Sequence, residues 1–275
     1  MLIDGKQYAQ EIKVSLAHAL AKSTQTLSFH IIYVGSDPVI DNFIHYKKKF
    51  GAELGISVFV HRFPETIVIE ELRSAIEEIS PLASGMIVQL PLPAHLDTQS
   101  VLDSIPAPKD VDVLARHTRA LFVDYQTELV PPVTAAVMYI LEKNNISLQN
   151  KKIVVVGNGN LVGYPTTLWL EREGYSYHLV TEETNERERN SYLKEADVII
   201  SGVGIPALIT PSMISESVVC IDAGTSESGK KIQGDFHPDC AEKASVFTPV
   251  PGGVGPLTIA LLYQNIISAY FSYHD

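Results

Sequence analysis

Two series of short apolar segments, each alternating with stretches of helical spacing, constrain the fold of this chain most. Such alternation is typical of βαβ units, in which helices cover both faces of a mostly parallel sheet. The first series predicts strands at residues 29–34, 57–63 and 85–90. It predicts helices at residues 5–21, 39–54, 68–79 and 98–104, before a segment at 109–113.

A second series follows a predicted helix at residues 134–143. It predicts strands at residues 152–156, 177–181, 198–202, 218–223 and 246–247. We place the domain boundary near residues 147–151 and expect the apolar C-terminal helix to return to the first domain. The predicted domains are therefore residues 1–146 with helix 258–275, and residues 147–257.

The composition narrows the classes of function. The chain has 275 residues, of which 45% are hydrophobic, and a net charge of −11, which argues against a nucleic-acid-binding surface. It starts without a basic and apolar leader and contains only Cys220 and Cys240, so we expect a reducing cytoplasm and neither a disulfide framework nor a zinc site. Gln264 and Asn265 interrupt the apolar C-terminal segment, which favours a buried helix over a membrane span.

A glycine-rich loop between a predicted strand and a predicted helix indicates a dinucleotide site. Residues 157–163 read GNGNLVG, and such glycines permit a tight turn that brings a pyrophosphate to a helix N-terminus. The spacing is GxGxxxG rather than GxGxxG, so the strand–loop–helix context is more informative than the motif. The second domain is therefore predicted to be a Rossmann-type, doubly wound parallel sheet. The predicted cofactor contacts in this domain are Gly157, Asn158, Gly159, Gly163, Gly204 and Thr225.

Two acidic residues bear on the choice of nucleotide. Glu182 and Glu183 follow the second predicted strand of this domain. A carboxylate there accepts a hydrogen bond from the ribose 2′-hydroxyl of NAD and repels the 2′-phosphate of NADP. Solvated loop charges explain the two residues equally well. We therefore expect NADP or NAD as cofactor, with NAD slightly favoured and Glu182 at the ribose.

The run TPVPGGVGPLT, residues 248–258, is shaped by its backbone. It places three prolines and three glycines in eleven positions, directly before the apolar C-terminal segment. Proline fixes φ, whereas glycine lets another molecule approach the backbone closely. Both a rigid interdomain turn and a ligand-contacting loop at a helix N-terminus fit this pattern.

Several motifs, in their order along the chain, resemble one family. VGSDPVIDNFIHYKKK at residues 34–49, GMIVQLPLP at 85–93 and KDVD at 109–112 lie in the first half. PVT at 132–134, VGNGNLVGYP at 156–165 and TPVPGGVGPLT at 248–258 lie in the second. Over nearly the whole chain they resemble the methylenetetrahydrofolate dehydrogenase/methenyltetrahydrofolate cyclohydrolase family. The resemblance implies two α/β domains flanking a cleft, a tetrahydrofolate derivative as substrate, and a homodimer.

The resemblance also implies roles for individual residues. The catalytic lysine of the family falls on Lys47, the glutamine that orients it on Gln89, and the aspartate that binds the pterin ring on Asp112. In this role the lysine transfers protons during hydrolysis of the methenyl compound, which a lowered pKa favours. Without the resemblance, Lys47 would be interpreted as part of a solvated helix face. The further substrate contacts implied are Phe43, Val113, Pro251, Gly252 and Gly253.

The chain departs from the family at several ligand contacts. Phe43 replaces a tyrosine, so stacking is kept but the hydroxyl is lost. Val113 replaces the glycine that follows KDVD, and Asn158-Gly159 replaces an arginine-serine pair. We expect the loss of the hydroxyl to harm hydrolysis more than hydride transfer. Asp110 and Asp112 resemble a DxD metal pair, but no partner lies at ligand spacing, and we predict no metal.

Two classes of function remain open from the sequence. The leading hypothesis is a folate enzyme with dehydrogenase activity and weakened cyclohydrolase activity. The alternative is a catalytically silent relative that binds folate or nucleotide, or that pairs with an active homologue. Phe43 and Val113 favour the silent relative, whereas Lys47, Gln89 and Asp112 favour the enzyme. A shikimate-type dehydrogenase is the weaker third option, because it lacks the VQLPLP and PGGVGP motifs.

Overall fold

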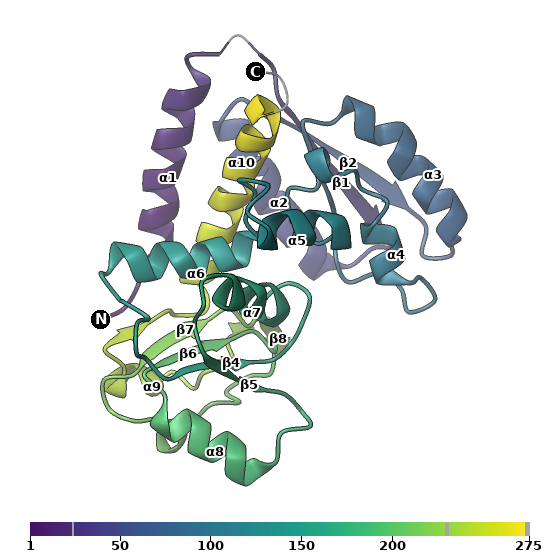
Figure 1. Ribbon diagram of the computed structural model, residues 1–275. Coiled ribbons are helices and arrows are strands. Elements are labelled where there is room, and N and C mark those ends of the chain that lie inside the picture. The colour runs from purple at the N-terminus through teal and green to yellow at the C-terminus, as the bar shows by residue number, and fades with distance from the viewer. Residues whose placement is uncertain (24, 229–230, 273–275) are drawn as a thin grey trace. The chain divides into compact units, whose positions relative to one another are not determined.

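The computed structural model describes residues 1–23, 25–228 and 231–272 (Figure 1). The chain divides into two compact units. The glycine-loop unit comprises Met1–Ala9 and Val133–Thr258, and the lysine unit comprises Gln10–Pro132 and Ile259–Asp275. Each unit contains a sheet of parallel strands, so the predicted α/β fold is confirmed.

The limits of these units differ from the expected domain limits near the middle of the chain, where the division lies between Pro132 and Val133 rather than at residues 147–151, and at the start of the chain. Met1–Ala9 belongs to the glycine-loop unit. The reason is backbone pairing: the N–H of Ile3 donates to the carbonyl of Phe247, and the N–H of Phe247 donates to the carbonyl of Met1, both at 2.9 Å. The first residues therefore extend the edge of the sheet in the glycine-loop unit.

A three-stranded parallel sheet in the order β2–β1–β3 forms the centre of the lysine unit. β1 (Ser28–Val34) pairs with β2 (Ser57–Phe63) and with β3 (Gly85–Val88), and Ile31 lies opposite Ile87. All but the first residue of β1 are buried, as expected for a central strand covered on both faces.

The helix α2 (Pro38–Glu53) begins immediately after the end of β1. The carboxylate of Asp37 accepts a hydrogen bond from the N–H of Val39 at 2.7 Å, and Pro38 occupies the first helical position. The start of α2 is therefore fixed at the carboxyl end of the sheet. The other helices with residues in this unit are α1 (Gly5–Leu20), α3 (Ile69–Ile79), α4 (Thr98–Leu102), α5 (Arg116–Val123) and α10 (Val254–Ser272), with 3₁₀ turns at Ser80–Leu82 and Ala107–Lys109.

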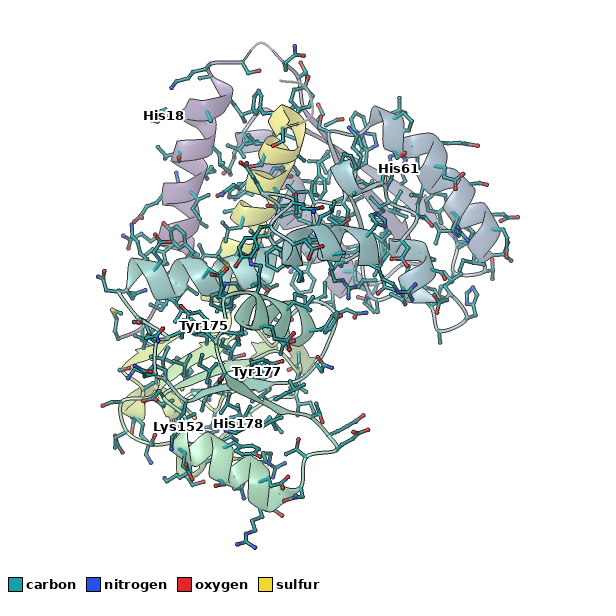
Figure 2. All side chains as sticks on the ribbon, in the orientation of Figure 1. His18, His61, Lys152, Tyr175, Tyr177 and His178 are labelled. Atoms are coloured by element: carbon teal, nitrogen blue, oxygen red, sulfur yellow. The ribbon has the colours of Figure 1, made fainter. Side chains whose placement is uncertain are left out.

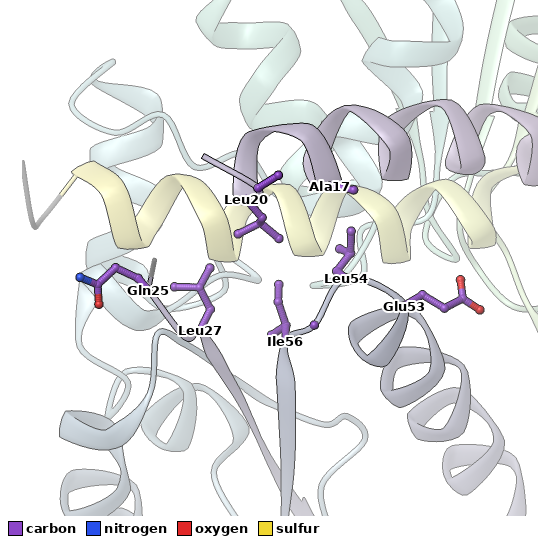
Figure 3. A pocket seen from close by; sticks show the side chains of 9 residues that line it. Ala17, Leu20, Gln25, Leu27, Glu53, Leu54 and Ile56 are labelled. Atoms are coloured by element: carbon purple, nitrogen blue, oxygen red, sulfur yellow. The ribbon is translucent and has the colours of Figure 1, made fainter. Parts of the chain in front are cut away.

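The C-terminal helix α10 contributes to the core of the lysine unit and runs beside α1 (Figures 1 and 3). Tyr263 and Ile266 are completely buried, and the ring of Tyr263 packs edge-on against Phe29 with the ring centroids 5.6 Å apart. In the described part of the chain, α10 is the one helix long and apolar enough to cross a membrane, but 56% of its apolar window is buried in the structure. This burial is typical of the core helix of a globular unit.

The glycine-loop unit contains a five-stranded parallel sheet in the order β10–β7–β6–β4–β5. Read from β5, the chain order is 2-1-3-4-5, a doubly wound order that reverses between β4 and β6. The predicted Rossmann-type sheet is therefore confirmed, and the switch point of its strand order lies at the carboxyl ends of β4 and β6. The strands are β4 (Ile153–Val156), β5 (Tyr177–Val180), β6 (Val198–Ser201), β7 (Val219–Asp222) and β10 (Val246–Phe247).

Some elements of both units lack a clear signal in the sequence. The helix α8 (Glu186–Glu195) buries Leu193 alone, so it has no apolar stripe. The short helix α5 and the hairpin of β8 (Ser226–Ser228) and β9 (Lys231–Gln233) were also not predicted. The remaining elements of the glycine-loop unit are α6 (Pro132–Lys143), α7 (Gly163–Arg172), α9 (Cys240–Lys243) and a 3₁₀ turn at Pro211–Met213.

Candidate functional site

The amine of Lys47 contacts the residue that follows β3. Lys47 lies on α2, one turn after Phe43, and its Nζ donates to Oε1 of Gln89 at 2.7 Å. The N–H of Gln89 donates to the carbonyl of Ile32 at 2.8 Å, and its Nε2 donates to the carbonyl of Leu90 at 2.9 Å. Because Leu90 uses the amide nitrogen, the amide oxygen faces Lys47.

The carboxylate of Asp112 acts on Lys47 electrostatically. Burial lowers the pKa of Lys47, and Asp112 opposes that shift. Burial raises the pKa of Asp112 to about 6, while Lys47 lowers it and Asp110 raises it further. Lys47 therefore gives up its proton at a lower pH than a solvated lysine does, and Asp112 limits this effect.

Asp110 has a structural position beneath this site. It is 1% exposed, its Oδ2 accepts from the N–H of Ala115 at 2.8 Å, and burial raises its pKa. A parallel bridge connects its backbone to Met86 of β3. Asp110 thus holds the loop after Asp112 against the sheet. Over the residues that the structure describes, no group of three or more His, Cys, Asp or Glu is arranged to hold a metal ion.

Val113 has an unusual backbone conformation. Its φ is 57°, in the left-handed region that costs a β-branched residue energy and that glycine adopts freely. Its N–H donates to the carbonyl of Asp110 at 3.2 Å, and the residue has no exposed surface. Within the lysine unit, Val113 is therefore a strained, buried residue rather than part of an open surface.

Two polar residues of α10 support the site, and the sequence did not indicate these contacts. Oη of Tyr263 donates to the carbonyl of Lys47 at 2.7 Å. Nδ2 of Asn265, which is 6% exposed, donates to the carbonyls of Val111 and Val130 at 2.8 and 2.7 Å. α10 thus fixes both the helical turn that carries Lys47 and the segment before Asp112. The sequence marks Asn265 only as a polar residue in an apolar run.

A hollow of about 300 Å³ also lies in the lysine unit, at the C-terminal end of α2 (Figure 3). Leu20, Leu27 and Ile56 line it, and Glu53 at its edge forms an ion pair with Lys13. As far as the structure describes the chain, its lining contains none of the predicted site residues. The hollow is therefore separate from the Lys47 cluster.

In the glycine-loop unit, the loop after β4 permits close approach of a ligand. A Cβ on Gly163 would lie 1.9 Å from the carbonyl oxygen of Gly157, so glycine alone fits at the start of α7. Asn158 and Gly159 are exposed beside this helix N-terminus. Such N-termini favour anionic groups. The loop therefore fits the pyrophosphate of a dinucleotide.

The neighbouring loops lie at the same edge of the sheet, because parallel strands share their carboxyl ends. Glu182 and Glu183 are exposed in a turn in which the N–H of Thr181 donates to Oγ1 of Thr184 at 2.9 Å. The loops after β6 and β7 are adjacent, since a Cβ on Gly204 would lie 3.3 Å from the carbonyl oxygen of Thr225.

The loop that contains Pro251, Gly252 and Gly253 also belongs to the glycine-loop unit. The N–H of Gly253 donates to the carbonyl of Pro249 at 2.7 Å, and the N–H of Gly5 donates to the carbonyl of Gly252 at 2.9 Å. Backbone hydrogen bonds therefore shape this loop. The structure groups it with the glycine loop, and groups Phe43 with the side chains around Lys47.

A doubly wound parallel sheet with a glycine loop before its first helix is the architecture of the dinucleotide-binding class of α/β proteins. Residues 3–112 match the tetrahydrofolate dehydrogenase/cyclohydrolase catalytic domain. Residues 131–274 match the NAD(P)-binding domain of the same name. The chain therefore belongs to the tetrahydrofolate dehydrogenase/cyclohydrolase family, and residues 113–130, with Val113 and α5, lie between the two matches.

Individual relatives agree with this assignment over the full chain. The chain is 35% identical to the bifunctional protein FolD of Nautilia profundicola, over 98% of this chain and 96% of that protein. The crystal structure of FolD from Campylobacter jejuni superposes with a TM-score of 0.92 at 31% identity, covering 99% of both chains. FolD of Trypanosoma brucei, solved with NADP and an inhibitor, gives a TM-score of 0.93 at 26% identity and covers 100% of this chain and 99% of that one.

Proposed function

We propose that this protein oxidises 5,10-methylenetetrahydrofolate to 5,10-methenyltetrahydrofolate with a nicotinamide cofactor and hydrolyses that product to 10-formyltetrahydrofolate. The observation that carries the proposal is the 2.7 Å contact between Lys47 Nζ and Gln89 Oε1, beside Asp112, in the part of the chain that matches the catalytic domain. Membership of the family supports the same pair of reactions.

Lys47 is the proton-transfer residue of the hydrolytic step. Its neutral Nζ takes a proton from the water whose oxygen bonds to the methenyl carbon. When the bond from this carbon to N5 breaks, the ammonium returns that proton to N5, the formyl group stays on N10, and the second proton of the water leaves to solvent. Gln89 Oε1 accepts from Nζ and holds it in place during this exchange.

The remaining residues of the lysine unit bind and orient the folate. Asp112 binds the pterin ring and keeps the pKa of Lys47 from falling further. Phe43 stacks against the substrate, but its phenyl ring has no hydroxyl to carry a proton, so hydrolysis is weaker than hydride transfer. Val113 supports the pterin end of the site. Pro251, Gly252 and Gly253 are further proposed substrate contacts, made through the backbone.

A bound nicotinamide nucleotide supplies the hydride acceptor. The loop after β4 holds its phosphates at the start of α7, because this edge combines a helix N-terminus with glycines that admit close approach. The absence of an arginine-serine pair at Asn158-Gly159, together with Glu182, favours NAD over NADP. The residues proposed to contact the nucleotide are Gly157, Asn158, Gly159, Gly163, Glu182, Gly204 and Thr225.

We place the enzyme in the cytoplasm and propose that it is a homodimer formed through the glycine-loop unit. The support is β5, the outer strand of the five-stranded sheet, which carries Tyr177 and His178 (Figure 2). The ring of His178 stacks on Tyr192 of α8 with centroids 4.0 Å apart. Such an edge offers backbone and aromatic surface to a second copy. Light scattering of the purified protein should give the mass of a dimer, and a monomer would contradict the proposal.

The two reactions can be tested in one assay. Purified protein is mixed with methylenetetrahydrofolate and either NAD or NADP, and formation and decay of the methenyl product are followed. We expect product with both nucleotides, faster turnover with NAD, and decay above the buffer rate. Equal rates with NAD and NADP would remove the cofactor preference. Binding of folate and nucleotide in calorimetry without turnover would instead identify a catalytically silent relative.

A further inference from the structure

Two buried carboxylates lie beneath the loops at the carboxyl edge of the five-stranded sheet. Asp235 has no exposed surface, and Asp222 at the end of β7 is 2% exposed. Neither has a part in the proposed proton transfer or in direct contact with a ligand. Buried carboxylates are costly unless strong hydrogen bonds compensate them, so their partners show what they stabilise.

Asp235 binds three consecutive N–H groups of the loop after β6. Its Oδ1 accepts from the N–H of Gly204 at 2.8 Å and of Ile205 at 2.9 Å. Its Oδ2 accepts from the N–H of Val203 and from Oγ of Ser201, both at 2.7 Å. All four partners are donors, so the site fits a group with two acceptor oxygens, a carboxylate rather than an amide.

Asp222 holds the segment that carries Asp235. Its Oδ1 accepts from the N–H of Asp235 at 3.1 Å and of Gly224 at 3.0 Å, and its Oδ2 accepts from the N–H of Phe236 at 2.9 Å. A Cβ on Gly224 would lie 2.2 Å from the carboxyl group of Asp235, so the chain after β7 passes directly over that group. The two carboxylates therefore connect the loops after β6 and β7, which contain Gly204 and Thr225.

These contacts determine what the loop after β6 can present to a ligand. Its N–H groups at residues 203–205 are used by Asp235 and do not point to a bound phosphate. The side chains of Val203 and Ile205 are instead 38% and 50% exposed. The loop thus turns its polar backbone groups inward to Asp235 and its apolar side chains outward.

We infer that Asp235 is a positioning residue for the cofactor: it holds the loop at residues 203–205 in the conformation that contacts the nicotinamide nucleotide, and acts through Gly204 without touching the nucleotide. This inference rests on the proposed function, because it takes cofactor binding at this edge as given. Asp235 was not distinguished in the sequence, where it is one acidic residue in an ordinary loop.

The substitution Asp235→Asn tests the inference at nearly constant volume. The amide oxygen of the new side chain takes the place of one carboxylate oxygen. Its NH₂ group takes the place of the other and faces hydrogen-bond donors, with which it cannot pair. We expect the Kd for NAD and for NADP, measured by calorimetry, to rise roughly 5- to 100-fold, because buried donors lose their acceptor. Methenyl hydrolysis, which uses no nucleotide, should stay within about twofold of wild type. The matched control is Asp239→Asn, an exposed residue before α9 that makes no capping bond, and it should change neither property.

The outcomes separate failure of the inference from failure of the proposed function. Wild-type protein that binds neither nucleotide would refute the proposed function. Wild type that binds, with a folded Asp235→Asn variant of unchanged Kd, would overturn the role of Asp235 alone. Equal losses of binding and hydrolysis in a folded variant would also overturn the role of Asp235, because they would indicate a general structural effect of the substitution. If Asp235→Asn does not fold, the substitution Ser201→Ala, which removes one of the donors to Asp235, tests the inference instead. About a tenfold higher Kd with intact hydrolysis supports the inference, and an unchanged Kd refutes it.

Discussion

The two regions that we propose contact ligands use different parts of the chain. In the lysine unit the proposed chemistry belongs to side chains: Nζ of Lys47, Oε1 of Gln89 and the carboxylate of Asp112. In the glycine-loop unit the site is made of backbone, with Gly163 at a position that admits no Cβ. The difference teaches that one substitution can silence the first region without moving the fold, whereas in the second a single added Cβ at Gly163 forces the backbone to shift.

The two regions nevertheless share one means of support. In each, a buried carboxylate lies beside the residues proposed to contact a ligand and accepts hydrogen bonds from backbone N–H groups. Asp110 binds the N–H of Ala115 in the loop after Asp112, and Asp235 binds the N–H groups of residues 203–205. Loops that carry function are thereby given the rigidity that secondary structure gives to strands and helices.

The substitution with the largest expected effect removes the activity proposed for the side-chain region and leaves the backbone region unchanged. Lys47→Ala should reduce methenyl hydrolysis by about 10²- to 10⁴-fold, the range for loss of a general acid–base group. Hydride transfer, which depends on alignment, should fall less. Decay of the methenyl compound is the measurement. The control is Lys48→Ala, the exposed neighbour, which should retain wild-type rates. Equal losses in the two reactions would show that Lys47 binds substrate rather than transfers protons.

The substitution with the next largest effect disturbs the backbone of the loop after β4. Gly163→Ala places a Cβ 1.9 Å from the carbonyl oxygen of Gly157, so the loop must shift. We expect a loss of nucleotide affinity and of about 1–3 kcal/mol in the free energy of unfolding. Gly255→Ala is the control, since its Cβ would meet no atom within 4 Å and Gly255 is not among the proposed nucleotide contacts. Calorimetry with NAD that finds both variants alike would refute the close-approach argument.

A third prediction concerns the support of the lysine unit by α10. Asn265→Ala leaves the buried carbonyl of Val111 and the partly buried carbonyl of Val130 without their donor, at a cost of about 1–3 kcal/mol in unfolding free energy. Hydrolysis should fall with it while nucleotide affinity is kept. Gln264→Ala, at the exposed neighbouring position, should be neutral in denaturant unfolding. A neutral Asn265→Ala would mean that α10 does not hold the site.

A smaller effect tests the strain at Val113. Glycine normally destabilises a buried position relative to alanine, but at a φ of 57° alanine keeps the steric penalty and glycine does not. Val113→Gly should therefore be more stable than Val113→Ala by about 1 kcal/mol. Urea unfolding of the two variants measures the difference. The opposite order would show that the backbone at this position is relaxed.

The smallest expected effect is a displacement of the pH profile. Asp112 raises the pKa of Lys47, so Asp112→Asn should let Lys47 lose its proton at lower pH. The rising limb of hydrolysis with pH, measured at saturating substrate and corrected for the buffer rate, should then move to lower pH. A move to higher pH would contradict the assigned electrostatics.

The same contrast explains how much could be predicted from the sequence. The strands of the two parallel sheets were predictable, because most are short apolar runs with β-branched residues and a glycine or proline close by. Lys47, Gln89 and Asp112 could be named because they lie in specific motifs, and the structure places Lys47 against Gln89 and within the electrostatic influence of Asp112. Their catalytic and binding roles stay predictions until they are measured.

The supporting residues could not be predicted, for physical reasons. Tyr263 and Asn265 act on residues far earlier in the chain, and nothing in a local pattern records such a contact. Asp235 looks like a solvated loop acid until its burial is known. The helix α8 lacks an apolar stripe because it buries Leu193 alone. Local patterns thus reveal elements and reactive groups, whereas the contacts that hold them require the folded chain.

The central claim is that the side-chain region performs the chemistry and the backbone region binds the nucleotide. The most direct test is to titrate NAD and NADP into Lys47→Ala by calorimetry. If the two regions act independently, this variant is deficient in hydrolysis but binds both nucleotides with Kd values within about twofold of wild type. A Kd that rises in parallel with the loss of hydrolysis would contradict the claim, because Lys47 would then belong to the nucleotide site as well.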